Sequence, residues 1–281
     1  MPEQDTAPAP KQPQSLEEWI AFFGQADIPV LRSTAQQLHR LRAEGSADRI
    51  VDVVDDDPFM TLRLLRHLQM HKARHQLYEI VDARHALLMM GLETFFREVA
   101  TGRVAEELLG SQHEALAHLM HTVRRAQRAA YYAGDWALRL HDLHAQEVRT
   151  SALLSHVGEM LMWCFNPGPM LQIKTLQAAD RAQHSADAQL QVLGFSDMEL
   201  QRRLTMEWQL PELLVSLGDP AQAKLPRVRN VTLAVRLARH SDNGWHDAAL
   251  PDDFQEVALL LHMGVNEVMA LVKSGPAAVL R

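Results

Sequence analysis

The chain has 281 residues, of which 47% are hydrophobic and 22% charged, a composition typical of a globular protein. This length allows one large domain or two smaller ones. The net charge of -7 argues against a general electrostatic attraction to nucleic acid or to an anionic membrane surface. The single cysteine, Cys164, excludes an intramolecular disulfide and fits the reducing cytoplasm, where we expect the protein to act.

The first segment, residues 1–14, contains four prolines among polar residues and alanines. It has no apolar run, so it is predicted to be disordered and not a signal peptide. No stretch of 18 apolar residues occurs along the chain, so no transmembrane helix is expected.

From residue 15 onward, apolar residues recur at spacings of three and four, which predicts an almost entirely helical protein. Ser15 with Glu18 forms a capping box, and Asp57 before Pro58 predicts the start of another helix. Further helices are expected over residues 80–90, 92–104, 111–140, 144–165, 170–193 with a break, 196–208 and 225–240.

A boundary near residue 110 divides the predicted helices. We expect an N-terminal helical subdomain over residues 15–110 and a second helical part over residues 111–240. Residues 241–281 are predicted to form C-terminal helices that pack on the second part.

Two sets of short motifs resemble a known family. The first set comprises Ile28-Pro29-Val30-Leu31, the Asp57-Pro58 step with the leucine-rich helix that follows, and Ala86 to Leu92. The second set comprises His121-Thr122, Leu153 to Leu161, Leu193-Gly194-Phe195 and Leu210-Pro211. Their order and spacing over residues 25–240 are similar to the HDOD domain, an output domain of bacterial signalling proteins that is related to HD phosphohydrolases. The turn after the leucine-rich helix, residues 68–74, lacks the Ala-Asn-Ser pattern usual in that family.

The resemblance implies a fold class: all-α, an HDOD-like multi-helix bundle with the N-terminal helical subdomain described above. It also implies where an HD enzyme would hold its two metal ions. Such an enzyme uses a histidine on one helix, an adjacent His-Asp pair on a second helix and an aspartate on a third, because imidazoles and carboxylates suit these ions.

These ligand positions are mostly lost. His121 matches the first histidine, whereas Ser155 and His156 stand where the His-Asp pair would be, and Val235 replaces the last aspartate. Sliding the register by one residue does not restore the set. We therefore expect a protein that is not an enzyme, with no metal or other cofactor at these vestigial positions.

The resemblance and the lost ligands together predict a pseudoenzyme: a non-catalytic signal-transduction adaptor that acts through protein–protein interaction with signalling proteins in trans. Neither nucleic acid nor a membrane is expected as a partner. Two alternatives remain open. One is a metal-dependent phosphohydrolase or phosphodiesterase with a rebuilt HD site. The other is a sensor of small molecules such as nucleotides, using a vestigial pocket between the helices of His121 and His156.

Other groups of charged residues have ordinary structural interpretations. Arg124, Arg125 and Arg128 follow His121 on one predicted helix and suggest an anion-binding patch, although a solvated helix face is the more usual explanation. The same holds for His67, His71 and His75, whose spacing also suits zinc.

An acidic run at residues 55–57 and three aromatic residues of the first helix are further candidates for a functional role. Asp55 and Asp56 precede the predicted cap Asp57 and are interpreted as part of a helix start, not as a metal site. The aromatic residues of the first helix, Trp19, Phe22 and Phe23, are interpreted as core, with an interaction surface as the alternative.

Overall fold

The computed structural model describes residues 12–71, 82–180, 183–242 and 244–275. These residues form an all-α protein, as the sequence predicted, and contain no β-strand. An isolated parallel bridge joins Val30 to Val104. Residues 1–11 of the predicted disordered segment lie outside the described residues.

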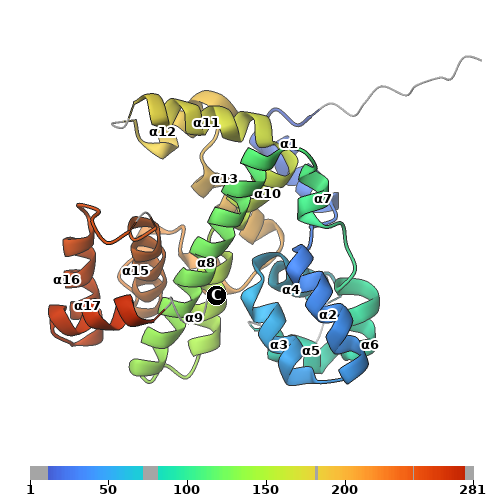
Figure 1. Ribbon diagram of the computed structural model, residues 1–281, viewed down its shortest axis with the longest axis horizontal. Helices are drawn as coiled ribbons and strands as arrows, with labels where there is room; N and C mark the ends of the chain where they lie inside the picture. The colour runs from blue at the N-terminus through green and yellow to red at the C-terminus, as the bar shows by residue number, and fades with distance from the viewer. Residues whose placement is uncertain (1–11, 72–81, 181–182, 243, 276–281) are drawn as a thin grey trace, which may run out of the picture.

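The N-terminal part forms a lobe of short helices beside the rest of the molecule (Figure 1). Helix α1 (Leu16–Gln25) lies apart from this lobe and packs against α13 (Asp197–Glu207). The lobe contains α2 (Arg32–Glu44), α3 (Ala47–Asp56), α4 (Pro58–Met70), α5 (Ala83–Met90), α6 (Leu92–Thr94) and the π-helical turn η1 (Phe95–Val99).

The long helix α8 (His113–Arg139) runs through the centre of the protein (Figure 1). It packs against α9 (Ala145–Leu154), α10 (Val157–Phe165) and α15 (Pro226–His240). Its buried face is rich in alanine, which lets the backbones of neighbouring helices approach closely: Ala115, Ala126, Ala129, Ala130, Ala133 and Ala137. Arginines of this helix contact carboxylates in both of the candidate clusters described below.

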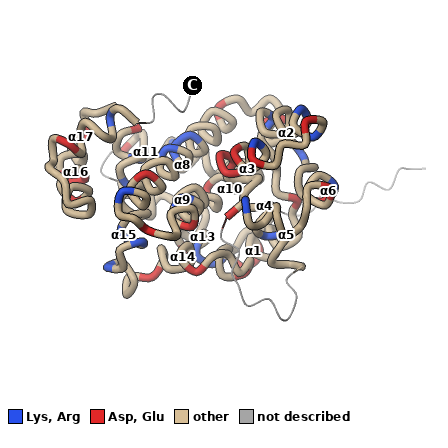
Figure 2. Tube along the Cα trace, turned by 90° about the horizontal axis from the view of Figure 1, so that it is seen from below, with Lys and Arg blue, Asp and Glu red and all other residues tan. Residues whose placement is uncertain are grey.

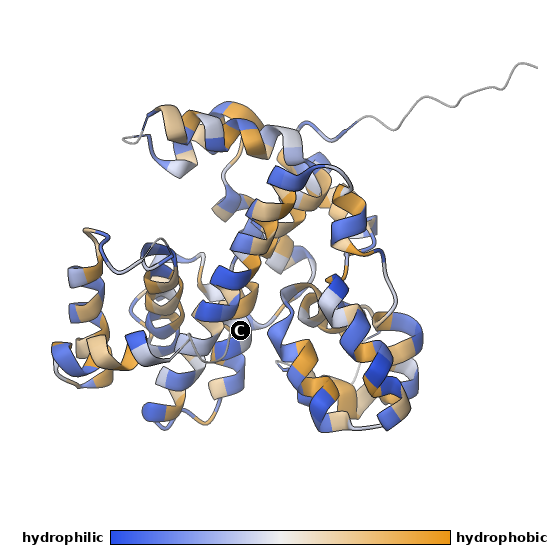
Figure 3. Ribbon diagram, viewed as in Figure 1, coloured by the Kyte–Doolittle hydropathy of each residue, from blue (hydrophilic) through white to orange (hydrophobic). Residues whose placement is uncertain are grey.

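The remaining helices surround this centre. They are α7 (Ala105–Leu109), α11 (Pro167–Ala179), α12 (Ser185–Leu193), α14 (Glu212–Ser216), the 3-10 turn η2 (Pro220–Gln222), α16 (Leu250–Leu261) and α17 (Val265–Ser274). Apolar residues lie mainly on helix faces that turn toward other helices (Figure 3). Basic and acidic residues are interspersed along the chain (Figure 2).

Among the described residues, no single helix combines the length and apolarity needed to cross a membrane. Helices α16 and α17 reach that length and apolarity only as a pair, and they are bent by 102° at the break between them.

The predicted helix starts are confirmed where a side chain forms the cap. The Ser15 hydroxyl accepts a hydrogen bond from the Glu18 amide at 3.2 Å, and Asp57 accepts bonds from the two amides that follow Pro58. Asp55 and Asp56 lie in the last turn of α3, directly before this cap, and their electrostatic contribution to the helix start stays a prediction.

Two predicted helices are broken. The helix expected over residues 92–104 ends at Val99, and the chain then becomes extended enough for Val30 to pair with it. The helix expected over residues 144–165 is interrupted at Ser155 and His156. Continuous apolar character predicted a single helix in both cases, and tertiary contacts override it.

The predicted boundary near residue 110 stays a prediction, but the structure shows how the lobe is held. Arg149 of α9 donates to the Asp55 carbonyl at 2.8 Å and to the Asp56 carboxylate at 2.6 Å. In the first helix, Trp19 and Phe23 are buried and belong to the core, whereas Phe22 is 37% exposed, so the core prediction was wrong for Phe22.

Candidate functional site

The break between α9 and α10 lies at Ser155 and His156 and is bridged by a side chain from α13. The Gln201 amide oxygen accepts from the Gly158 backbone N–H, and its nitrogen donates to the Leu154 carbonyl, both at 2.9 Å. In an unbroken helix the Gly158 N–H would donate to the Leu154 carbonyl directly. The Gln201 amide therefore takes the place of one peptide hydrogen bond.

His156 lies at this break and precedes the first turn of α10. Its ring, the Glu159 carboxylate and the Asp197 carboxylate each offer one atom, and these atoms lie within 4.8 Å of one another. His156 Nδ1 is 3.7 Å from Asp197 Oδ2, an ion-pair distance that is too long for a hydrogen bond. These three residues are called the His156 cluster below.

Glu159 is 9% exposed and is held by three donors. The Arg125 guanidinium of α8 lies 2.7 Å from Oε2, while the Thr122 hydroxyl and the Trp163 indole N–H donate to Oε1 at 3.2 and 3.4 Å. A hydrogen-bonded guanidinium is what a buried carboxylate needs to remain charged.

The two carboxyl groups of the cluster differ in their proton affinity. Burial alone would raise the pKa of Glu159, but the positive charges of Arg125, His156 and Lys174 outweigh it and lower that pKa to about 2. Burial raises the pKa of Asp197, and the charge of Glu159 raises it further, while His156 opposes them. Glu159 is therefore anionic at neutral pH, and Asp197 lacks a comparably strong cationic partner.

A second group of charges lies against α8 near the end of α15. His121 Nδ1 is 3.3 Å from Asp242 Oδ2, and Arg128 Nη2 is 3.1 Å from Asp242 Oδ1. Arg128 also donates to the Ser241 carbonyl at 3.4 Å. The Asp242 side chain is only 6% exposed. These residues are called the Asp242 cluster below.

The four vestigial positions do not form one set of ligands. His121 pairs with Asp242, whereas His156 faces Asp197 on a different helix. The Ser155 hydroxyl donates to a carbonyl of its own helix at 2.8 Å. Val235 is a partly buried aliphatic residue of α15 and offers no ligand atom.

Two of the three arginines in the suggested anion-binding patch are engaged elsewhere. Arg125 belongs to the Glu159 ion pair and Arg128 to the Asp242 cluster, while Arg124 is exposed. The anion-binding patch stays a prediction, and its main charges are already paired with internal carboxylates.

Sequence reasoning missed Glu159, Asp197 and Gln201. The i, i+3 spacing of His156 and Glu159 was available as a signal, because residues at that spacing share a helix face. The HD pattern contains no ligand at position 159, so this spacing lies outside it. The approach of α13, which brings Asp197 and Gln201 to the break, is a long-range contact without a local sequence pattern.

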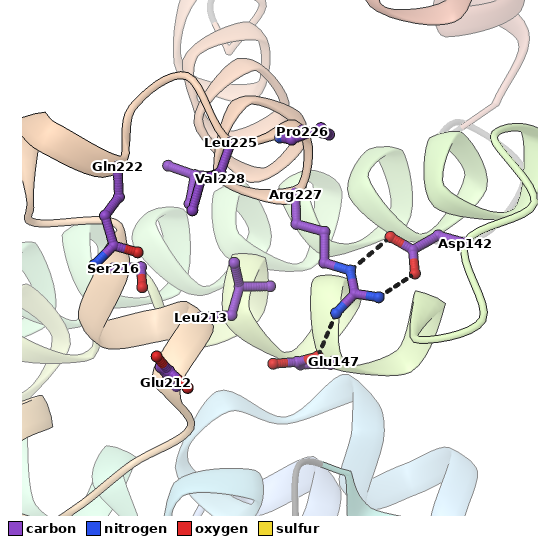
Figure 4. Close-up of a pocket in the computed structure, with 10 residues that line it drawn as sticks. All are labelled: Asp142, Glu147, Glu212, Leu213, Ser216, Gln222, Leu225, Pro226, Arg227 and Val228. Carbon is purple, nitrogen blue, oxygen red and sulfur yellow. Dashed lines mark hydrogen bonds and ion pairs between the residues drawn. The ribbon is translucent and has the colours of Figure 1, made fainter.

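A cavity of about 380 Å³ lies elsewhere, between α9, α14 and the start of α15 (Figure 4). Arg227 extends along its wall and donates two hydrogen bonds of 2.8 Å to Asp142 and one of 3.3 Å to Glu147. Glu212 also lines the cavity, beside apolar residues such as Leu213. The cavity is lined by three carboxylates and one arginine whose guanidinium is already paired with two of them, so it is unfavourable for an anionic ligand such as a nucleotide phosphate.

The remaining predicted histidine group is only partly described. His67 and His71 stack with ring centroids 4.2 Å apart, and burial together with the neighbouring His71 lowers the pKa of His67. His75 lies outside the described residues. A zinc site across all three histidines therefore stays untested.

Comparison with known proteins identifies the family. The family model of the HDOD domain matches residues 28–219, which is more than half of the chain. The chain belongs to the HDOD family. The comparison of this HDOD protein with curated proteins gives no match.

Solved structures show the same fold. The MmoQ response regulator from Methylococcus capsulatus has a TM-score of 0.67 and 18% identity, over 88% of this HDOD chain and 98% of that chain. A virulence factor from Campylobacter jejuni gives 0.64 and 14%, over 90% and 96%. An HDOD domain protein with unknown function from Geobacter sulfurreducens gives 0.50 and 17%, over 92% of both chains.

Proposed function

We propose that this HDOD protein is a non-catalytic adaptor of bacterial signal transduction that binds signalling proteins in trans in the cytoplasm. The observation that carries the proposal is the state of the four HD positions. Only His121 keeps the original residue type, and it is paired with the internal carboxylate of Asp242. Ser155 and Val235 contribute no metal-binding group.

The charges near these positions support the same function. Two-metal hydrolysis requires carboxylates that are free to bind and bridge two divalent cations. Helix α8 instead places Arg125 against Glu159 and Arg128 against Asp242. A fixed guanidinium beside each carboxylate repels an incoming pair of cations, most strongly where burial lowers the dielectric constant.

Family membership supports a role in signalling. The chain resembles the HDOD output domains of bacterial signalling proteins, and one solved structure with the same fold is described as a response regulator. We expect affinity capture from the host, with the full chain as bait and chemical cross-linking, to recover a signalling protein. Binding is then to be reproduced with the purified pair. A protein that forms no reproducible complex under these conditions would contradict the adaptor proposal.

Catalysis is tested separately. The purified full chain, supplied with Mn²⁺ or Fe²⁺, is incubated with cyclic dinucleotides and with nucleoside phosphates. We expect no turnover. Turnover that His121→Ala or Asp197→Asn abolishes, but that the exposed-residue control Arg124→Ala leaves intact, would overturn the proposal.

That outcome would instead support the alternative of a phosphohydrolase with a rebuilt site. One observation favours this alternative, namely the convergence of His156, Glu159 and Asp197. The sensor alternative predicts that a nucleotide raises the thermal unfolding midpoint, and the acidic cavity near Arg227 gives it no support.

A further inference from the structure

The His156 cluster joins two helices through side chains that metal ions commonly bind. His156 is the residue directly before α10, and Glu159 lies in the first turn of that helix. Asp197 is the first residue of a separate helix, α13. The three candidate ligand atoms come within 4.8 Å of one another.

Unpaired polar atoms at the cluster are a second, independent observation. Both ring nitrogens of His156 and the Oδ1 atom of Asp197 are buried, and none has a hydrogen-bond partner among the residues that the structure describes. Buried polar atoms in folded proteins are nearly always paired with protein, with water or with an ion. Three such atoms at one place therefore indicate a partner that bonds to imidazole nitrogen and carboxylate oxygen together.

The surrounding groups orient Glu159 for this role. Arg125, Thr122 and Trp163 bind its two oxygens and fix the carboxylate plane. Hydrogen bonds of this kind from outside a metal site orient the ligands and tune their affinity. The Arg125 charge also opposes a cation, so the cluster is suited to one ion and not to two.

We propose that His156, Glu159 and Asp197 bind one divalent transition-metal ion, of the zinc or manganese class, which fastens α10 to α13. One imidazole and two carboxylates suit these ions, whereas Mg²⁺ and Ca²⁺ prefer oxygen ligands alone. Tetrahedral zinc spaces its ligand atoms about 3.3 Å apart, given bonds of about 2.0–2.1 Å. Side-chain rotations that shorten the separations between the three atoms by up to about 1.5 Å would complete the site, and water would supply a fourth ligand.

This inference does not rest on the adaptor function, because an ion that fastens two helices needs no turnover and no partner protein. The full chain is stripped with a chelator and dialysed against Zn²⁺, Mn²⁺ or Mg²⁺, and bound metal is measured by elemental analysis. We expect saturable binding of one Zn²⁺ or Mn²⁺ per chain, a higher thermal unfolding midpoint with either ion, and no comparable binding of Mg²⁺.

Variants identify the ligands. His156→Ala and Asp197→Asn should each weaken Zn²⁺ binding by at least about 100-fold, the upper end of what loss of a supporting residue costs. His121→Ala is the matched control, since it removes a histidine beside a carboxylate of the Asp242 cluster, and it should leave Zn²⁺ binding unchanged. Asp197→Asn preserves the side-chain shape, so it carries the test if His156→Ala does not fold.

Absence of saturable Zn²⁺ and Mn²⁺ binding by the unmodified chain would overturn the inference, as would equal affinity in the unmodified chain and Asp197→Asn. A loss of affinity in His121→Ala as large as in His156→Ala would also overturn it. Metal binding without turnover supports both this inference and the adaptor proposal. Turnover would contradict the adaptor proposal alone.

Discussion

The Asp242 cluster and the His156 cluster both lie against α8. Each brings together an imidazole, at least one carboxylate and an arginine of α8, but the number of carboxylates differs. In the Asp242 cluster, a single carboxylate is contacted by both Arg128 and His121. In the His156 cluster, only one of two carboxylates, that of Glu159, is contacted by a guanidinium, and the His156 imidazole makes no hydrogen bond to any residue that the structure describes. The first cluster is complete as an internal ion pair, whereas the second still has capacity for a ligand. One helix therefore supplies arginines to two sites that retain different amounts of binding potential.

The largest expected effect comes from removing the Arg125 guanidinium, which contacts Glu159 of the His156 cluster. Arg125→Met leaves the buried Glu159 carboxylate without its ion-pair partner, which should lower the free energy of unfolding by about 3–5 kcal/mol. Urea denaturation at pH 7 measures it. The double variant Arg125→Met with Glu159→Gln removes both charges and should recover most of the loss. A loss below about 1 kcal/mol in the single variant would show that Glu159 is solvated there.

A third carboxylate, Asp55, extends the comparison to a site where burial dominates. Its Oδ1 atom has no hydrogen-bond partner among the described residues, and Arg149 lies 3.7 Å from Oδ2. Burial raises the pKa of Asp55 from 3.8 to about 6, although Arg149 opposes the shift. Because the folded protein holds this proton more tightly than the unfolded chain, ionised Asp55 destabilises the fold above pH 6. The penalty fades as the pH falls from 6 to 3.8.

Asp55→Asn should therefore raise the free energy of unfolding at pH 8 by roughly 2–3 kcal/mol, as a shift of about two pKa units implies. The gain should fall to well under 1 kcal/mol by about pH 4 and vanish near pH 3, where Asp55 is protonated in both the folded and the unfolded state. Denaturant titrations at pH 8 and pH 3 measure the difference. Asp56→Asn, at a side chain 64% exposed, is the control and should change stability by less than about 1 kcal/mol. An equal gain at both pH values would contradict the burial of an unfavourable charge.

A smaller effect is expected in the Asp242 cluster. Arg128→Met removes a charged hydrogen bond, which should cost about 1.5–3 kcal/mol in urea denaturation, because His121 still contacts the carboxylate. His121→Ala should cost less, about 0–1 kcal/mol, since its side chain is 44% exposed. If Arg128→Met lowered the free energy of unfolding by more than Arg125→Met does, the Asp242 cluster would contain the more stabilising ion pair, contrary to the prediction.

Local rules were sufficient for much of the fold. The caps at Ser15 and Asp57 follow from the side chains themselves and were predicted correctly, as was the all-α class. Helix continuity through Ser155 was predicted wrongly, because apolar periodicity contains no information about a glutamine that approaches from α13. The His156 cluster was missed for the same reason, since Asp197 lies about forty positions further along the chain.

From the sequence, the candidate site could be predicted only at the positions that the HD ligand pattern defines. The comparison of His121, Ser155, His156 and Val235 with HD ligands pointed to α8, to the break between α9 and α10, and to α15, but not to α13. That ligand pattern contains no residue at the position of Glu159, so it gave no signal for this carboxylate. The buried Glu159 is paired with Arg125 of α8, which lies 34 positions earlier in the chain.

The Gln201 side chain makes the geometry of the break between α9 and α10 depend on the position of α13. Its amide closes the gap between Leu154 and Gly158, and a Cβ atom at Gly158 would lie only 3.3 Å from the Gln201 Oε1 atom. Any sliding of α13 must therefore either carry the bend with it or release two hydrogen bonds together. A displacement of α13 along its axis would therefore also disturb the break between α9 and α10, because Gln201 bonds to the backbone on both sides of it.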